Sequence, residues 1–113
     1  MSVEKGKINK MSVIIGNEDN FNELVTKNIT VVDFFATWCG PCKMLGPVLE
    51  EIASERSEVQ IVKIDVDQNP NLSKTYGIMS VPTMILFKDG KPIATKNGYV
   101  PKELIHSWIE ENK

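Results

Sequence analysis

The sequence is poor in the side chains that bind metals or build disulfide frameworks. It has two cysteines, Cys39 and Cys42, and one histidine, His106, among 113 residues. A structural zinc site needs four ligands, so ligand count argues against a site within one chain, while a site shared between two copies is less excluded. His106 is expected near the solvent edge of the last helix with no special role. The cysteine pair therefore favours redox chemistry over metal binding.

Long apolar runs and a strong charge of one sign are also lacking. No run approaches the ~20 residues of a membrane span, and residues 1–10 lack the apolar core of a signal peptide. A net charge of −2 provides no basic footprint for nucleic acid. We therefore expect a cytoplasmic protein that binds neither nucleic acid nor membrane. In a reducing cytosol, paired cysteines are more often catalytic or metal-binding than structural.

The length and composition indicate one globular domain. The chain has 113 residues, of which 42% are hydrophobic and 25% are charged. Residues 1–10 are polar and lysine-rich, so we interpret them as a leader. The domain is expected to cover residues 11–113.

Hydrophobic patterns predict alternating strands and helices before the final third of the chain. Strand-type runs occupy residues 11–15, 30–36 and 59–66. The first strand is followed by a short helix with Asn17 as its expected N-cap. The second leads through the cysteines into a longer helix, and Asn69-Pro70 begins a short helix after the third, ended by Gly77.

The last third is expected to contain a hairpin and a closing helix. Strand-type runs at 83–87 and 92–96 are joined by residues 88–91, where Asp-Gly favours a tight turn. These two strands should be antiparallel. Helical spacing of apolar residues then continues through Ile109. The chain is therefore expected to have an α/β fold with a mixed sheet between helices.

Cys39 and Cys42 lie where a strand gives way to a helix, so their environments should differ. Unpaired N–H groups and the positive dipole end of the helix would stabilise a thiolate on Cys39. Cys42, one turn further in, should be more covered. This predicts that Cys39 attacks a substrate disulfide and that Cys42 then attacks Cys39 to release the product. Pro41 fits the helix start and stiffens the loop.

Asp33 and Lys63 interrupt two apolar strands. Asp33 is either buried, with a raised pKa that makes it a proton acceptor near Cys42, or it faces a solvated edge or satisfies a backbone group. Lys63 could pair with Asp33 if the two strands are neighbours, or reach out to water.

Two further features are ambiguous from the residues alone. An ordinary Val81-Pro82 peptide bond would be trans. Trp38, beside the cysteines, is either a contact surface or a cap on the core.

Several segments together resemble the thioredoxin family. The residues at 31–43, Val-Val-Asp-Phe-Phe-Ala-Thr-Trp-Cys-Gly-Pro-Cys-Lys, carry the strongest similarity. Segments 65–70, 76–78, 81–83 and 87–90 resemble the family as well, and the order is maintained from about residue 11 to the end. The combination is far more specific than an isolated pair of cysteines.

The resemblance implies the thioredoxin fold, a central mixed five-stranded sheet flanked by four helices. It also implies a protein-disulfide reductase in which Cys39 is the exposed nucleophile and Cys42 the resolving thiol. Asp33 becomes a buried acid–base group acting on Cys42, and Lys63 tunes it.

The resemblance extends the site to a substrate groove. Val81 would offer backbone hydrogen bonds beside a cis Pro82, and Gly98 would permit close approach. The remaining implied groove residues are Trp38, Gly40 and Pro41. Tyr99 and Phe35 depart from many relatives, and the bulk of Tyr99 bears on partner choice.

The implied redox group is a Cys39–Cys42 disulfide, without a bound cofactor or metal. The implied partners are disulfide-containing proteins and a thioredoxin reductase that draws on NADPH, with the protein acting as a monomer. The Gly-Pro dipeptide is similar to that of reducing members. Two alternatives remain, a binding subunit with this fold and a disulfide oxidase or isomerase.

Overall fold

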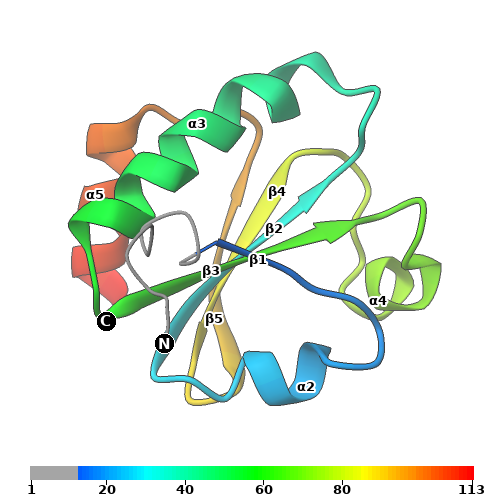
Figure 1. Ribbon diagram of the computed structural model, residues 1–113, viewed down its shortest axis with the longest axis horizontal. Coiled ribbons are helices and arrows are strands. Elements are labelled where there is room, and N and C mark those ends of the chain that lie inside the picture. The colour runs from blue at the N-terminus through cyan, green and yellow to red at the C-terminus, as the bar shows by residue number, and fades with distance from the viewer. Residues whose placement is uncertain (1–12) are drawn as a thin grey trace, which may run out of the picture.

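The computed structural model describes residues 13–113, which contain five strands and four helices (Figure 1). The expected leader and the first two residues of the expected first strand lie outside the described residues. None of the helices in the described part is long and apolar enough to cross a membrane.

The strands form one mixed sheet in the order β1-β3-β2-β4-β5. β2 pairs in parallel with β3 and antiparallel with β4. β4 and β5 pair antiparallel, as the hairpin signal predicted. The strands are β1 (Val13–Ile15), β2 (Ile29–Phe35), β3 (Val59–Asp65), β4 (Thr83–Lys88) and β5 (Lys91–Asn97).

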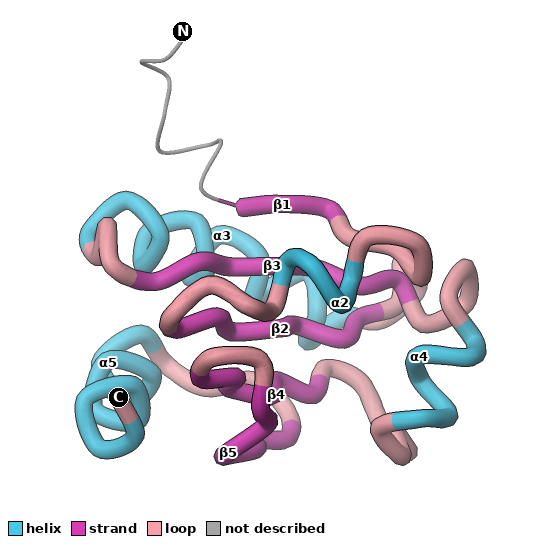
Figure 2. Tube along the Cα trace, turned by 90° about the horizontal axis from the view of Figure 1, so that it is seen from below, coloured by secondary structure: helices cyan, strands magenta, loops and turns pink. Residues whose placement is uncertain are grey.

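Helices cover both faces of this sheet. α3 (Gly40–Glu55) and α5 (Lys102–Asn112) lie on one face, and α2 (Phe21–Leu24) and α4 (Pro70–Thr75) lie on the other, as Figure 1 shows with the strands overlapping between them. Figure 2 shows the strands side by side in the order of the sheet. β2, in the middle, is therefore covered on both sides, which explains its nearly continuous apolar sequence.

The sheet separates two hydrophobic cores. The first joins β-strand side chains to Leu45, Leu49 and Ile109 on α3 and α5. The second is rich in aromatic residues, and the ring of Phe21 lies 5.6 Å from that of Phe87. Burial of these side chains on both faces fixes β2 and hence the point where the chain leaves it for α3.

The predicted helix caps have different outcomes. Gly77 follows α4 with a φ of +63°, so the predicted stop is confirmed. The prediction for Asn17 was wrong, because α2 begins after Asn20. The Asn17 Oδ1 instead accepts the N–H groups of Asp19 and Asn20 and closes the preceding turn.

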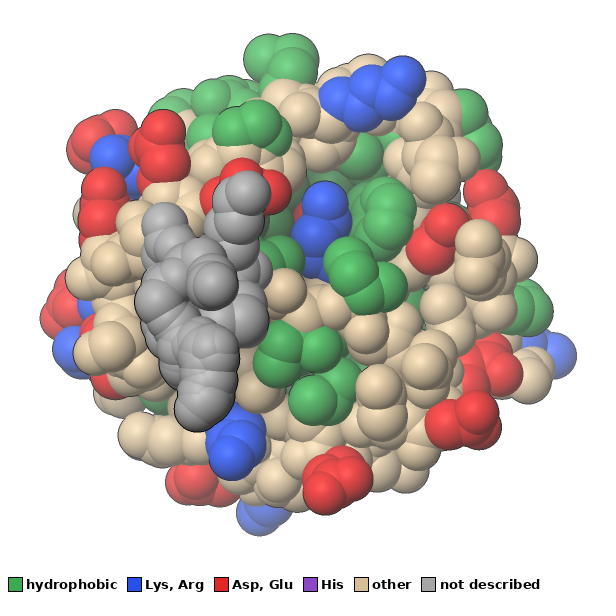
Figure 3. Space-filling view, in the orientation of Figure 1, with side chains coloured by type: hydrophobic (Ala, Val, Ile, Leu, Met, Phe, Trp, Pro, Cys, Tyr) green, Lys and Arg blue, Asp and Glu red, His purple; other side chains and the backbone are tan. Residues whose placement is uncertain are grey.

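An ionic network joins α3 to α5. Arg56 Nε donates to His106 Nδ1 at 2.7 Å, which places the imidazole proton on Nε2, 2.9 Å from Glu55 Oε1. Arg56 also pairs with Glu58 and Glu110 at 2.9 and 2.8 Å. The expectation that His106 has no special role was wrong, because it links the two helices. Figure 3 shows acidic and basic side chains gathered over this side of the molecule.

Candidate active site

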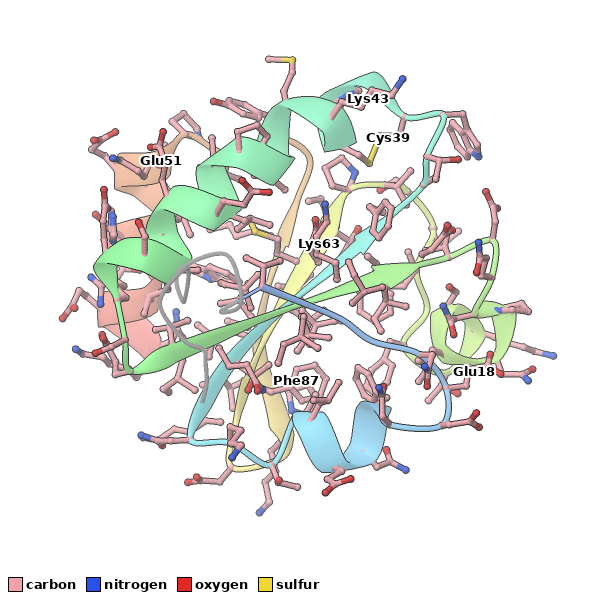
Figure 4. The ribbon with its side chains drawn as sticks, in the orientation of Figure 1. Glu18, Cys39, Lys43, Glu51, Lys63 and Phe87 are labelled. Carbon is pink, nitrogen blue, oxygen red and sulfur yellow. A yellow bond between two sulfur atoms is a disulfide. The ribbon has the colours of Figure 1, made fainter. Side chains whose placement is uncertain are left out.

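The two cysteines lie at the start of α3, directly after the loop that follows β2. Cys39, labelled in Figure 4, is the N-cap residue. Cys42 is in the first turn. Their sulfur atoms are joined in a disulfide, with the Cα atoms 5.2 Å apart. Pro41 also lies in this first turn, where the missing N–H is not needed for a helical hydrogen bond.

The difference between the two sulfur atoms lies in hydrogen bonding. The Cys42 N–H donates to Cys39 Sγ over 3.1 Å. Cys39 and Cys42 are 5% and 4% exposed, so both residues are buried to nearly the same extent in the disulfide form. The pair packs as a unit with Ala36, Phe35 and Val81, which covers both residues.

The loop before β4 lies against the disulfide. The Val81-Pro82 bond is cis, as the resemblance implied and contrary to the ordinary trans expectation. The Val81 carbonyl oxygen lies 3.7 Å from Cys39 Sγ. Gly98, with a φ of +81°, donates its N–H to the Pro82 carbonyl at 2.7 Å, and so brings the end of β5 to the same place.

Asn97 strengthens the same junction. Thr83 Oγ1 donates to Asn97 Oδ1 at 3.0 Å, one residue before Gly98. Segments 39–42, 81–83 and 97–98 are distant in sequence, yet they are joined by these contacts. The structure therefore brings the predicted residues Val81, Pro82 and Gly98 together with the cysteines.

Trp38 is a surface residue beside the disulfide. It is 69% exposed, so the interpretation as a cap on the core was wrong. Its indole Nε1 donates to Asp67 Oδ2 at 2.9 Å, and the Asp67 N–H donates to Asp65 Oδ1. These bonds hold the ring at the surface, where one face can contact a partner.

An apolar hollow adjoins Trp38. Its lining residues are Trp38, Val66, Ile78, Met79, Ser80 and Val81. Sequence reasoning missed Met79 and Asp67. The available signal for Met79 was an apolar side chain in the loop directly before Val81-Pro82.

Asp33 is completely buried in β2. Neither carboxyl oxygen has a hydrogen-bond partner among the described residues. Burial raises its pKa to about 7, although the positive charge of Lys63 opposes this rise. The buried interpretation is confirmed and the solvated-edge alternative was wrong. Near neutral pH the carboxyl can therefore either accept or release a proton.

Lys63 is the register neighbour of Asp33 on the adjacent strand β3. The two side chains form no ion pair, so the possibility of direct pairing was wrong even though the strands are neighbours. The Lys63 Nζ lies 4.7 Å from the centroid of the Phe35 ring. Figure 4 shows Lys63 on the sheet below the start of α3. Its Nζ lies close to Gly46 of that helix, because a Cβ added to Gly46 would be 3.6 Å from Nζ.

The described residues contain no cluster of three or more His, Cys, Asp or Glu side chains placed to hold a metal ion. His106 is engaged by Arg56 and Glu55. The groups with redox or acid–base chemistry described here are the disulfide at the start of α3 and the buried acid in β2.

Comparison with known proteins assigns this arrangement to a family. The family model described as thioredoxin matches residues 12–111. The chain belongs to the thioredoxin family. The thioredoxin fold implied by the motifs is therefore confirmed, including its five-stranded mixed sheet and four helices.

Individual relatives agree with the assignment. Thioredoxins from Staphylococcus saprophyticus and Staphylococcus aureus are 43% and 46% identical to the chain, each over 90% of it and 99% of the relative. The solved structure of a mutant thioredoxin from Halobacterium salinarum is 34% identical, has a TM-score of 0.83, and is matched over 88% of both chains.

Membership of the thioredoxin family defines the general activity. The protein is a thiol-disulfide oxidoreductase of the protein-disulfide reductase type. Its redox group is the Cys39–Cys42 disulfide, and thioredoxins carry no bound cofactor.

Proposed function

We propose that this thioredoxin reduces disulfides in other proteins with Cys39 as the attacking group and Cys42 as the resolving group. The observation that carries the proposal is the 3.1 Å hydrogen bond from the Cys42 N–H to Cys39 Sγ. In the reduced protein this donor, at a helix N-terminus, would stabilise negative charge on Cys39. No backbone N–H in residues 13–113 donates to Cys42 Sγ.

The reaction then proceeds in two exchanges. The Cys39 thiolate attacks one sulfur of the substrate disulfide, forms a mixed disulfide and displaces the other substrate sulfur as a thiolate. The Cys42 thiolate next attacks Cys39 Sγ, displaces the second substrate thiolate and forms the Cys39–Cys42 disulfide. Two electrons pass to the substrate, and its two thiolates take up protons.

Asp33 supports the second exchange by accepting the Cys42 proton, directly or through water. A carboxyl with a pKa of about 7 is matched to this task, because it is partly ionised at neutral pH. Lys63 tunes the acid through its positive charge without contacting it.

The surface around the disulfide would bind an extended substrate segment. The backbone of Val81, beside cis Pro82, offers hydrogen bonds, and Gly98 leaves room for close approach. Trp38, Gly40 and Pro41 complete this surface.

Electrons would reach the disulfide from NADPH through a thioredoxin reductase. A monomer in the cytoplasm fits this role, since a small redox carrier must leave the reductase to meet substrate proteins. Tyr99, 40% exposed and next to Gly98, would affect the choice of partner.

Trapping experiments test the two cysteine roles. Cys42→Ser should accumulate mixed disulfides with protein substrates through Cys39, whereas Cys39→Ser should trap almost none. Non-reducing electrophoresis followed by peptide mass spectrometry would measure both. Equal trapping by the two variants would contradict the assignment.

A coupled assay tests the direction of electron flow. NADPH oxidation is followed with candidate thioredoxin reductases and insulin as the disulfide substrate. Turnover with wild type and none with Cys39→Ser supports the proposal. Partner binding and activity that survive removal of both thiols would favour a binding subunit, and oxidation of a reduced protein substrate would favour an oxidase.

A further inference from the structure

We propose that Met79 is a site of reversible oxidation, at which a sulfoxide weakens the binding of protein substrates. The inference rests on the proposed function, because it assigns the effect to the substrate surface beside the disulfide. No other described methionine combines this exposure with this position.

Met79 is unusually accessible for an apolar side chain. It is 95% exposed, yet it lines the hollow shared with Trp38, Ile78 and Val81. The hollow is continuous with the reactive centre, because the Val81 carbonyl lies 3.7 Å from Cys39 Sγ. A protein segment that places an apolar side chain in the hollow while it reacts with Cys39 would therefore lie close to the Met79 thioether.

The other described methionines provide an internal comparison. Met84 is fully buried in β4, so an oxidant in solution cannot reach it. Met44 is 60% exposed on α3 but does not line the hollow. Met79 and Met44 should both be oxidised, but only oxidation of Met79 should alter substrate binding.

The oxidation has a simple balance. A peroxide transfers one oxygen atom to the Met79 sulfur, which loses two electrons, and hydrogen peroxide leaves as water. The flexible apolar thioether becomes a polar sulfoxide. Methionine sulfoxide reductases reverse the change, one enzyme for each sulfoxide epimer.

The sulfoxide would oppose apolar contact at the hollow. An apolar substrate side chain would then bury a polar S=O group that has lost its water. We expect the second-order rate constant for reduction of insulin to fall about fivefold, which corresponds to ~1 kcal/mol. Oxidised glutathione has no large apolar side chain to place in the hollow, so its rate should not change.

The experiment uses the full chain with its disulfide formed, so that the cysteines are protected during peroxide treatment. Catalase then removes the peroxide, and peptide mass spectrometry measures the oxidised fraction at each methionine. Dithiothreitol reduces the disulfide, and the desalted protein is mixed with insulin or oxidised glutathione. Each reduced protein reacts once, so the second-order rate constant of this single turnover is measured before and after peroxide for wild type, Met79→Leu and Met44→Leu.

After peroxide treatment, the rate constant for insulin reduction should fall about fivefold in wild type and Met44→Leu. In Met79→Leu the ratio of the rate constants after and before treatment should stay near one. Met1 and Met11 are present in all three proteins, so they cancel in this comparison. Treatment with both sulfoxide reductases should restore the wild type. Unchanged insulin kinetics despite complete Met79 oxidation, an unreactive Met79, or an equal loss in Met79→Leu would overturn the inference. Failure of the untreated protein to reduce insulin would instead contradict the proposed function.

Discussion

Charged side chains are paired at the α3–α5 contact, whereas the buried acid in the centre of the sheet is not. At the contact, Arg56 has two carboxylate partners and a histidine, and its side chain is 14% exposed. In the sheet, Asp33 is fully buried and its carboxyl oxygens have no hydrogen-bond partner among the described residues. One region pairs its charges and the other leaves a buried acid unpaired.

The pKa values of the carboxyls differ between the two regions. Hydrogen bonds lower the pKa of both glutamates at the contact. The largest cause is the bond from Arg56 at Glu110 and a backbone hydrogen bond at Glu58. Both carboxyls therefore stay ionised near neutral pH. Burial moves the pKa of Asp33 the opposite way, to about 7. Of these three carboxyls, Asp33 is therefore the one that can change its protonation state near neutral pH.

The largest expected effect is on the pH dependence of stability in Asp33→Asn. The folded-state pKa of about 7 lies above the ordinary 3.8, so the folded protein binds the proton more tightly than the unfolded chain. Stability is then lost as pH rises from about 4 to about 7, by on the order of 4 kcal/mol. Asp33→Asn should remove this decline, so that the variant is more stable than wild type at pH 8 and similar at pH 4.

Urea unfolding of the disulfide form at several pH values would measure this change. Asp19→Asn provides a matched control, since Asp19 is an exposed carboxylate. It should retain the wild-type decline. A wild-type stability that stays flat between pH 4 and 8 would contradict the raised pKa of Asp33.

The next effect is on release of the mixed disulfide. Asp33→Asn cannot accept the Cys42 proton, so this step should slow by about 10- to 100-fold at pH 7. Stopped-flow measurement on a mixed disulfide at Cys39 would follow it. The wild-type rate should rise with pH through about 7 and the variant should lose that rise. Identical rate profiles would exclude proton transfer by Asp33.

A smaller effect is expected at the α3–α5 contact. Arg56→Met retains much of the apolar stem but removes two ion pairs and the bond to His106, so the free energy of unfolding should fall by about 1 kcal/mol. Insulin reduction should not change. Lys102→Met, which loses bonds to Glu51 and Glu55, should have a smaller effect that disappears at high salt. A loss of activity in Arg56→Met would show that the two regions are coupled.

The smallest effect is expected in Lys63→Met. Lys63 lowers the pKa of Asp33 from a distance, so its removal should move that pKa further above 7. Carbon-13 NMR of the Asp33 carboxyl as a function of pH would detect the shift. Lys88→Met, at the exposed end of β4, is the control and should leave the titration unchanged. No movement in Lys63→Met would show that this charge does not reach Asp33.

The sequence predicted the fold through features that are local. Apolar runs, the Asp-Gly turn at 89–90 and the position of Gly77 depend on a few neighbouring residues, and each matches the structure. The predicted N-cap at Asn17 was wrong because its side-chain oxygen accepts two N–H groups of the preceding turn instead. The cis bond at Pro82 followed from the family resemblance and from no local pattern.

The site was less predictable, because its environment is made by distant segments. Burial of Asp33 depends on helices covering both faces of β2. Asp33 and Lys63 form no ion pair because the Lys63 Nζ lies over the ring of Phe35. The hollow at Met79 needs Trp38, Val66 and Val81 in one place. Such arrangements arise only when the chain is folded, so residue order alone could name most participants but not their contacts.

The junction of β5 with the Pro82 loop also affects chemical ageing. Asn97-Gly98 is the single Asn-Gly pair of the sequence, and such pairs deamidate when the glycine nitrogen attacks the asparagine side-chain carbon. Here the Gly98 N–H is bound to the Pro82 carbonyl, and the Asn97 side-chain oxygen accepts from Thr83. Ring closure would have to break both bonds. The contacts that shape the rim of the reactive site therefore also protect its backbone from slow rearrangement.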